Sequence, residues 1–285
     1  MSGSILIIGG DGLIGNALGH AGRRAGYNVY GTSRRRGTDL LFLDLVWEID
    51  DWPRLPDCDC VVICAAVIGL NECQRDPLLS YKVNVEGVSK VLKWCNAPDT
   101  QVIFLSSSSV FGDNIHHVTE DTPPDAITVY GEHKAIAEKA VLQHGGLVMR
   151  ITKVLDPLFP RFISWAVQLE NGNRVEAFNN LYASPVPVAS CAEALLAAIR
   201  WDWSGIVHLS GPEITNYFDM ARMLAKNLGY SEKNVVAVAG DLGAHGIGSA
   251  SVRLQSSQMI GGLRLHLPNT ETIIKEWVEA LPNYQ

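Results

Sequence analysis

The sequence lacks several features that would assign it to a particular class of protein. Its longest apolar stretch, near residues 61–70, is far shorter than the roughly 20 residues that cross a bilayer. Its 30 acidic residues outnumber its 23 basic residues, so we expect neither a nucleic-acid partner nor a membrane partner. No signal peptide precedes the first strand-like segment, and we therefore expect a cytoplasmic protein.

The sequence also lacks the ligand spacing of a metal site. Its six cysteines lie mostly inside apolar segments, which is typical of reduced, buried thiols rather than of a disulfide framework. Cys58 and Cys60 are spaced like half of a metal site, but no second pair of Cys or His residues accompanies them. His116 and His117 lie in a polar loop and are interpreted as an exposed pair. We expect no bound metal.

What the sequence does contain is a regular alternation of strands and helices up to residue 150. Apolar runs predict strands at 5–8, 28–32, 40–43, 60–65, 102–105 and 146–150, and helical periodicity predicts helices at 13–25, 46–52, 78–95 and 130–143. Such alternation favours right-handed crossovers, and uninterrupted apolar strands favour a sheet that is covered on both faces. The predicted fold is α/β, a doubly wound parallel sheet of the Rossmann type.

The pattern loosens after Arg150, where several prolines interrupt it. Helices are predicted at 192–200, 217–228 and 270–281, and a strand at 206–209. We expect a dinucleotide-binding domain over residues 1–150, to which residues 185–210 return. Residues 151–184 and 211–285 are expected to form a smaller C-terminal lobe that binds the substrate.

The loop between the first strand and the first helix has the sequence GGDGLIG. Glycines at this position let the backbone approach a pyrophosphate, and the N–H groups of the helix start favour negative charge. Two spacings fit the loop, one beginning at Gly9 and one at Gly10, and both end on Gly12 and Gly15. Under either spacing, Leu13 and Ile14 are expected beside the cofactor.

The residues that end the second predicted strand distinguish NADP from NAD. A carboxylate there would accept a hydrogen bond from the ribose 2′-hydroxyl, but the chain has Ser33, Arg34 and Arg35. A hydroxyl and guanidinium groups suit a 2′-phosphate, so we predict NADP(H) held by these three residues, with a solvated basic turn as the alternative. Asp44 and Leu45 are expected near the adenine, although Asp44 is also an ordinary helix-capping residue.

Two further motifs indicate reaction chemistry. Four serines, Ser106–Ser109, follow the fifth predicted strand, where doubly wound folds gather their ligands. Tyr130 and Lys134 are four residues apart on a predicted helix and therefore share one face. An ammonium group close to a phenol favours the phenolate, which would allow proton exchange near neutral pH.

The sequence resembles the extended short-chain dehydrogenase/reductase family over nearly its whole length. Its cofactor motif and catalytic set match those of the family, at Gly9, Gly12 and Gly15 and at Ser107, Tyr130 and Lys134. Residues 62–92, 118–141 and 205–229 resemble the nucleotide-sugar reductases of that family. The resemblance implies nicotinamide-dependent reduction of a keto sugar carried on a nucleotide diphosphate, and it favours the spacing that begins at Gly9.

The resemblance also implies roles for the catalytic set. Tyr130 donates a proton to the substrate carbonyl oxygen, Lys134 binds the nicotinamide ribose and lowers the pKa of Tyr130, and Ser107 holds the carbonyl oxygen. The serine is chosen by counting back from residues 110–112, and Ser109 is the second choice. Substrate contacts are expected from Ser107, Ser108, Ser109 and Tyr130.

Further cofactor contacts are implied by position. Ala65 and Ala66 lie where the family has a small-residue turn, Ser106 ends the fifth strand and Ile151 follows the sixth. Asn84 resembles an asparagine that shapes the cofactor region, and the alternative is a surface helix residue.

Three functions are compatible with these motifs and with the family resemblance. The first is an NADPH-dependent reductase of a nucleotide-linked 4-keto sugar, and the second is a nucleotide-sugar epimerase that keeps its cofactor. The third is a regulatory or binding subunit on the same fold, which the intact catalytic set disfavours. Dehydration is set aside because the Asp-Glu pair used by the family's dehydratases is absent after Ser107. A homodimer through the long helices would be common for the family.

Overall fold

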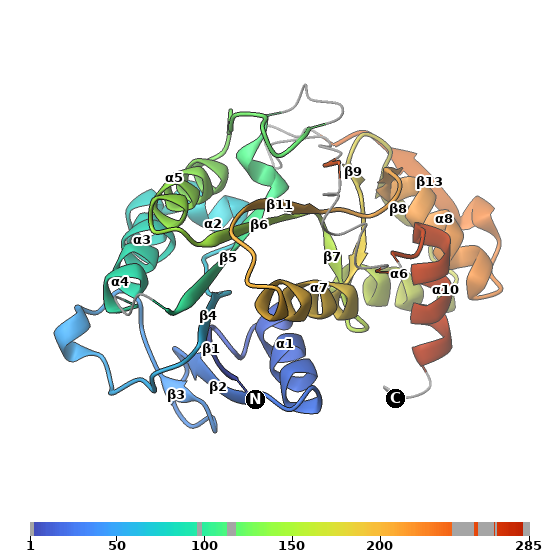
Figure 1. Ribbon diagram of the computed structural model, residues 1–285. Coiled ribbons are helices and arrows are strands. Elements are labelled where there is room, and N and C mark those ends of the chain that lie inside the picture. Colours follow the sequence, from blue (N-terminus) through green and yellow to red (C-terminus); the bar gives the residue numbers. More distant parts are fainter. Residues whose placement is uncertain are drawn as a thin grey trace.

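The computed structural model describes residues 3–95, 99–112, 118–240, 254–255, 265 and 267–281. Its centre is a seven-stranded sheet in which every neighbouring pair is parallel (Figure 1). From edge to edge, the strands are β11 (Gly205–Leu209), β6 (Leu147–Ile151), β5 (Gln101–Ser107), β4 (Cys60–Ile63), β1 (Ser4–Ile8), β2 (Asn28–Ser33) and β3 (Leu41–Phe42). This order confirms the predicted doubly wound parallel sheet.

Helices cover both faces of the sheet, which explains why its strands are apolar throughout. Successive side chains of β1 alternate, so Ile5 and Leu6 enter different hydrophobic clusters. Helices α1 (Leu13–Arg24) and α7 (Val188–Arg200) pack with each other in the cluster of Ile5. Helices α4 (Gly87–Trp94) and α5 (Val129–Gln143) pack in the cluster of Leu6 on the opposite face.

The helix predicted over 78–95 is present over residues 77–94, but it is irregular. It begins with α3 (Pro77–Tyr81), where the Asp76 side chain accepts a hydrogen bond from the Leu79 N–H, and it follows α2 (Leu70–Arg75) directly. A π-helical turn over Lys82–Glu86 then leads into α4. Asp76 and the proline after it form an ordinary helix start, which accounts for the earlier beginning.

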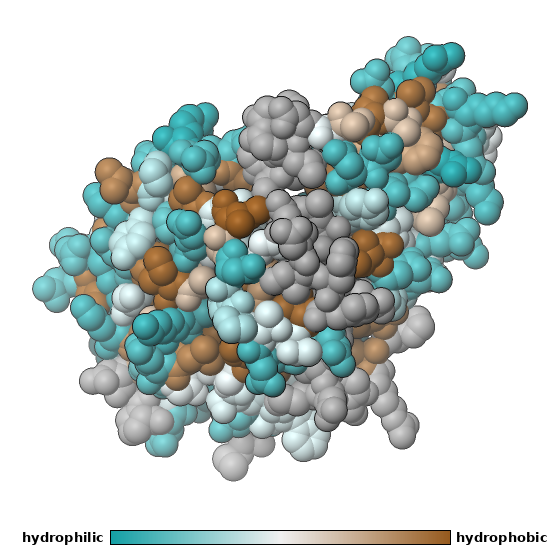
Figure 2. All heavy atoms as spheres, turned by 90° about the horizontal axis from the view of Figure 1, so that it is seen from above, coloured by the Kyte–Doolittle hydropathy of each residue, from teal (hydrophilic) through white to brown (hydrophobic). Residues whose placement is uncertain are grey.

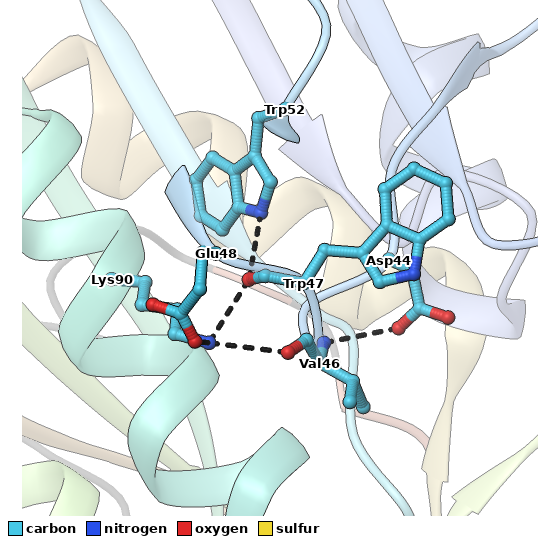
Figure 3. A network of polar contacts seen from close by, with 6 residues as sticks. All are labelled: Asp44, Val46, Trp47, Glu48, Trp52 and Lys90. Carbon is cyan, nitrogen blue, oxygen red and sulfur yellow. Dashed lines mark hydrogen bonds and ion pairs between the residues drawn. The ribbon is translucent and has the colours of Figure 1, made fainter. Parts of the chain in front are cut away.

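The helix predicted over residues 46–52 is wrong. Only Ile49–Asp51 form a short 3-10 turn. The Lys90 ammonium group on α4 donates hydrogen bonds to the carbonyl oxygens of Val46 at 3.2 Å and Trp47 at 2.9 Å (Figure 3). These bonds bind carbonyl groups that the first turn of a helix would use internally, so the segment forms separate turns beside α4 instead of a helix.

A smaller lobe lies beside the sheet (Figure 1). Its hydrophobic cluster contains side chains from α6 (Pro160–Glu170), β8 (Val175–Phe178), α8 (Tyr217–Asn227), β13 (Val235–Val238) and α10 (Thr270–Ala280). The shorter elements are η3 (Ser108–Val110), β7 (Val154–Leu155), β9 (Tyr182–Ala183), β10 (Val186–Pro187), β12 (Thr215–Asn216) and η4 (Glu232–Asn234). The segment between α6 and α8 returns to the sheet through α7 and β11.

The surface of the described residues shows no membrane-spanning element. None of the helices in these residues combines the length and the hydrophobicity that a bilayer crossing needs. On the face seen from above, apolar side chains are scattered among hydrophilic ones (Figure 2).

Candidate active site

A cavity of about 950 Å³ lies at the carboxyl ends of the parallel strands. It spans the junction between β1 and β4, where the strand order reverses and doubly wound sheets bind their ligands. All but one of the predicted site residues line it, namely Gly9, Gly12, Leu13, Ile14, Gly15, Ser33, Arg34, Arg35, Asp44, Leu45, Ala65, Ala66, Ser106, Ser107, Ser108, Ser109, Tyr130, Lys134 and Ile151. Asn84 is the exception. His116 and His117 lie outside the described residues.

The glycine loop has no room for a side chain at Gly9 or Gly15, two of the three motif positions. Gly9 has φ of +88°, and a Cβ there would lie 2.8 Å from the Ala65 backbone nitrogen. A Cβ on Gly15 would lie 2.3 Å from the Gly9 carbonyl oxygen. Gly10 lies outside the motif that begins at Gly9, yet it also has little room for a side chain. A Cβ on Gly10 would lie 3.0 Å from the Gly31 Cα.

The loop leads into a helix start that fits a phosphate group. Helix α1 is twelve residues long, and its N-cap residue, Gly12, places no side chain on the first N–H groups. Uncapped N–H groups at the start of a helix favour an anion. Together with the tight glycine turn, this helix start matches what a dinucleotide pyrophosphate requires.

Ser33 and Arg35, which are predicted to bind a 2′-phosphate, both contact the carboxylate of Asp11, a residue that the sequence did not indicate. The Ser33 hydroxyl donates to Asp11 Oδ2 at 2.8 Å, and Arg35 Nε lies 3.3 Å from the same oxygen. The Arg35 backbone N–H donates to Ser33 Oγ at 2.9 Å. Arg34 is exposed and lines the cavity beside them.

The loop after β3 forms another part of the cavity wall. Asp44 Oδ1 accepts a hydrogen bond from the Val46 N–H at 3.0 Å, so Asp44 turns the chain as well as lining the cavity (Figure 3). Leu45 is buried and also lines the cavity. The Lys90 ammonium group donates hydrogen bonds to the carbonyl oxygens of Val46 and Trp47, and these bonds fix the loop against α4.

Asn84 contributes indirectly to the cavity rather than lining it. It is buried in the π-helical turn, so the surface alternative is excluded. Its side-chain oxygen accepts from the Val67 N–H at 2.8 Å, and its amide nitrogen donates to the Val67 carbonyl oxygen at 2.9 Å. Val67 itself lines the cavity. Asn84 therefore fixes the segment after β4, because its amide satisfies both backbone groups of one residue.

Ser106 lines the cavity, but its hydroxyl is engaged in a buried network. It donates to Glu138 on α5, and Glu138 in turn pairs with Arg150 on β6. The side chains of the pair are only 2% and 1% exposed. Arg150 also contacts His208, which is fully buried, as expected for a core histidine. The network joins β5, β6 and α5 next to Ser107.

The hydroxyl groups predicted to react line the cavity at the end of β5. The Ser107 side chain lowers the pKa of Tyr130, and its hydroxyl donates to Ser109 Oγ at 3.1 Å. Both serines line the cavity, so the first and second choices for the reacting serine belong to one hydrogen-bonded group. Burial raises the pKa of Tyr130 well above its usual value, and the Ser107 side chain only partly offsets this.

Lys134 is buried, and its ammonium group contacts the backbone of β5 more closely than it contacts the Tyr130 ring. Its ammonium nitrogen donates to the Leu105 carbonyl oxygen at 2.7 Å and lies 4.3 Å from the centre of the Phe104 ring. It is 5.9 Å from the centre of the Tyr130 ring. Burial lowers the pKa of Lys134 to about 8. The expected lowering of the Tyr130 pKa is therefore outweighed by burial of the phenol.

The outer half of the cavity contains cationic and aromatic groups that the sequence did not single out. Lys153 and Arg161 both line it, and the pKa of Lys153 is lowered by burial and then by Arg161. Lys153 Nζ lies 5.2 Å from the Phe159 ring centre, and the Arg161 guanidinium lies 4.8 Å from the Tyr217 ring centre. No spacing signal connects these residues, since they come together only through folding of the lobe.

The fold and the site together define a class of enzyme. A glycine loop at the switch point of a doubly wound sheet, with a serine, a tyrosine and a lysine in the same cavity, defines the extended short-chain dehydrogenase/reductase enzymes. The chain matches the family described as RmlD substrate binding domain over residues 3–281, and it belongs to that family. The predicted oxidoreductase class is thereby confirmed.

Reductases and epimerases are among the proteins to which the chain is similar. The chain is 25% identical to the dTDP-4-dehydrorhamnose reductase of Mycolicibacterium smegmatis over 99% of this chain and 84% of that protein. The structure of the dTDP-4-dehydrorhamnose reductase of Bacillus anthracis in complex with NADP is similar, with a TM-score of 0.80 at 18% identity over 97% of this chain and 98% of that one. A UDP-glucose 4-epimerase of Thermotoga maritima has the same TM-score, 0.80, at 18% identity over 99% of both chains.

Proposed function

We propose that this protein is an NADPH-dependent reductase of a nucleotide-diphosphate-linked 4-keto sugar. The observation that carries the proposal is the presence of Ser107, Tyr130 and Lys134 in one cavity with the glycine loop. Hydride from the nicotinamide reduces the carbonyl carbon when the cofactor is bound. Membership of the RmlD family and the reductases among the relatives support the same reaction.

The cofactor would occupy the inner part of the cavity. Gly9, Gly12 and Gly15 with the start of α1 would hold its pyrophosphate, and Ser33 with the adjacent arginines would face the 2′-phosphate. The loop at Asp44 would border the adenine. In this arrangement residues 1–150 and 185–210 serve the cofactor, and the lobe serves the sugar nucleotide.

Tyr130 is suited to act as a proton donor rather than as a base. Its raised pKa keeps the phenol protonated at neutral pH, and it lines the same cavity as the Ser107 hydroxyl. Ser107 would hold the substrate carbonyl oxygen, on which Tyr130 then places its proton. Lys134, fixed by the Leu105 carbonyl group, would donate to the nicotinamide ribose and supply positive charge beside the phenol.

The outer cavity supports a nucleotide diphosphate as the sugar carrier. Lys153 and Arg161 are two cations at one wall, and guanidinium and ammonium groups bind diphosphates well. Phe159 and Tyr217 beside them offer ring faces for a base. No anionic side chain other than Asp156 borders these two cations among the described lining residues of the lobe.

The test is a spectrophotometric panel of NADPH and NADH with several nucleotide-linked 4-keto sugars. Oxidation of NADPH is expected with at least one sugar, and Tyr130→Phe should abolish it while leaving cofactor binding intact. Tyr30→Phe is the matched control, because Tyr30 is exposed on β2 outside the cavity lining and should retain full turnover. Full activity of Tyr130→Phe would refute the proposed mechanism.

The same panel separates the alternatives. An epimerase, supported by epimerases among similar structures, would interconvert sugars without net NADPH oxidation and would retain cofactor through purification. A regulatory subunit would bind cofactor and turn over none of the sugars.

We further propose a cytoplasmic homodimer that packs through α3 and α5. Leu78 on α3 is 77% exposed and Ile136 on α5 is 46% exposed, so both helices offer apolar side chains to a partner. Analytical ultracentrifugation of the pure chain tests the assembly, since a monomer at all concentrations would refute it.

A further inference from the structure

Asp11 places a carboxylate among the groups that would bind a 2′-phosphate. It lies within the glycine loop, and its side chain lines the cavity with 23% exposure. Its Oδ2 accepts the Ser33 hydroxyl hydrogen bond at 2.8 Å and lies 3.3 Å from Arg35 Nε. Ser33 itself is buried, so its hydroxyl has little freedom to turn to another acceptor.

These contacts set a carboxylate and a phosphate in competition for the same donors. The Ser33 hydroxyl has one proton to donate, and that proton is already given to Asp11. A 2′-phosphate would have to displace Asp11 from both Ser33 and Arg35, and it would meet a like charge at close range. Arg34 is the other cation of the turn that lines the cavity, and among the described residues it forms no ion pair. A ribose 2′-hydroxyl would instead find a free lone pair on the Asp11 carboxylate.

We propose that Asp11 is a specificity-determining residue that narrows the preference of this chain for the 2′-phosphorylated cofactor. The carboxylate penalises NADPH by competition and charge, and it favours NADH by accepting a hydrogen bond from the ribose. The chain therefore uses both cofactors, with a smaller preference for NADPH than Ser33, Arg34 and Arg35 alone would give. This inference rests on the proposed function, since it assumes that a dinucleotide binds in the cavity.

The experiment compares the dissociation constants of NADPH and NADH for the native chain and for Asp11→Asn by isothermal titration calorimetry. The amide keeps the size of the side chain and an oxygen that can accept from Ser33, but it removes the charge. The ratio of the NADH to the NADPH dissociation constant should rise about tenfold, equivalent to about 1.4 kcal/mol. Asp11→Ser, which is shorter and uncharged, should shift the ratio in the same direction.

A matched control removes the same charge elsewhere in the basic turn. Asp39 is exposed and lies outside the cavity lining, so Asp39→Asn should leave the ratio unchanged. The shift caused by Asp11→Asn should shrink at high salt, because screening weakens the repulsion between the carboxylate and the phosphate. A change of local folding alone would not have this salt dependence.

The outcomes separate the two proposals. If the native chain and Asp11→Asn bind both cofactors with the same ratio, Asp11 has no role in specificity and the inference is overturned, while the proposed function stands. If the native chain binds neither cofactor, the proposed function fails and the inference falls with it.

Discussion

The buried ion pair between Arg150 and Glu138 should be a major determinant of the stability of the sheet domain. Arg150 Nε donates to both carboxylate oxygens of Glu138, at 3.0 and 3.2 Å, and Nη2 donates to Oε2 at 2.8 Å. Ser106 completes the coordination of the carboxylate. Arg150→Met keeps most of the aliphatic stem of the side chain but, among the described residues, leaves Glu138 in the interior with only the Ser106 hydroxyl as a hydrogen-bond partner.

The expected cost follows from the burial of the pair. Side chains that are 1% and 2% exposed leave an uncompensated charge almost without water, and removing one partner of such a pair costs about 3–5 kcal/mol of unfolding free energy. The double variant Arg150→Met with Glu138→Leu removes both charges, so it should recover much of the loss. Lys275→Met is the control, because the exposed Lys275–Glu279 pair should contribute about 0.5 kcal/mol or less.

Urea unfolding followed by the fluorescence of the seven tryptophans measures these differences. A loss below about 1 kcal/mol at pH 8, or a double variant no more stable than the single one, would refute the reasoning.

Two further predictions concern lysines. Burial lowers the pKa of Lys134 to about 8 from 10.5, so between these pH values the unfolded chain binds a proton that the folded chain does not. The unfolding free energy should therefore contain a contribution that rises with pH across this window and is absent in Lys134→Met, as urea titrations at both ends would measure. Parallel pH profiles for the two proteins would contradict it. Lys90→Met removes the donor that holds two carbonyl groups of the loop after β3, so the dissociation constant of NADPH should rise on the order of fivefold while kcat changes little. Lys93→Met, exposed on the same helix, is the control, and equal cofactor titrations for the two variants would argue against a positioning role for Lys90.

The sheet could be predicted from the sequence because its strands are apolar on both faces. The runs at Ile5–Ile8 and at residues 102–105 have no polar side to face solvent, and only a doubly covered parallel sheet buries both sides. The segment at residues 46–52 could not be predicted in the same way. Its conformation depends on Lys90, which lies 43 residues beyond Trp47 in the chain and reaches it only after folding.

In the candidate site, too, features set by nearby residues could be predicted, and features set by contacts between distant residues could not. Glycine spacing and the interval from Tyr130 to Lys134 are local, so they located the loop and one helix face in advance. The roles of Asp11 and Arg161 depend on contacts with residues from other elements, and no spacing in the chain encodes them. The protonation of Tyr130 was also misjudged from the sequence, because burial of its ring is a property of the assembled core.

The late return of the chain to the sheet has a consequence for any attempt to divide the protein. Strand β11 pairs with β6 along its whole length, although residues 152–204 separate the two strands. A fragment that ends at residue 150 would leave the apolar strand β6 as an open edge with unpaired backbone groups, which is a template for intermolecular pairing. The same edge is open during ribosomal synthesis, because β6 is made before β11.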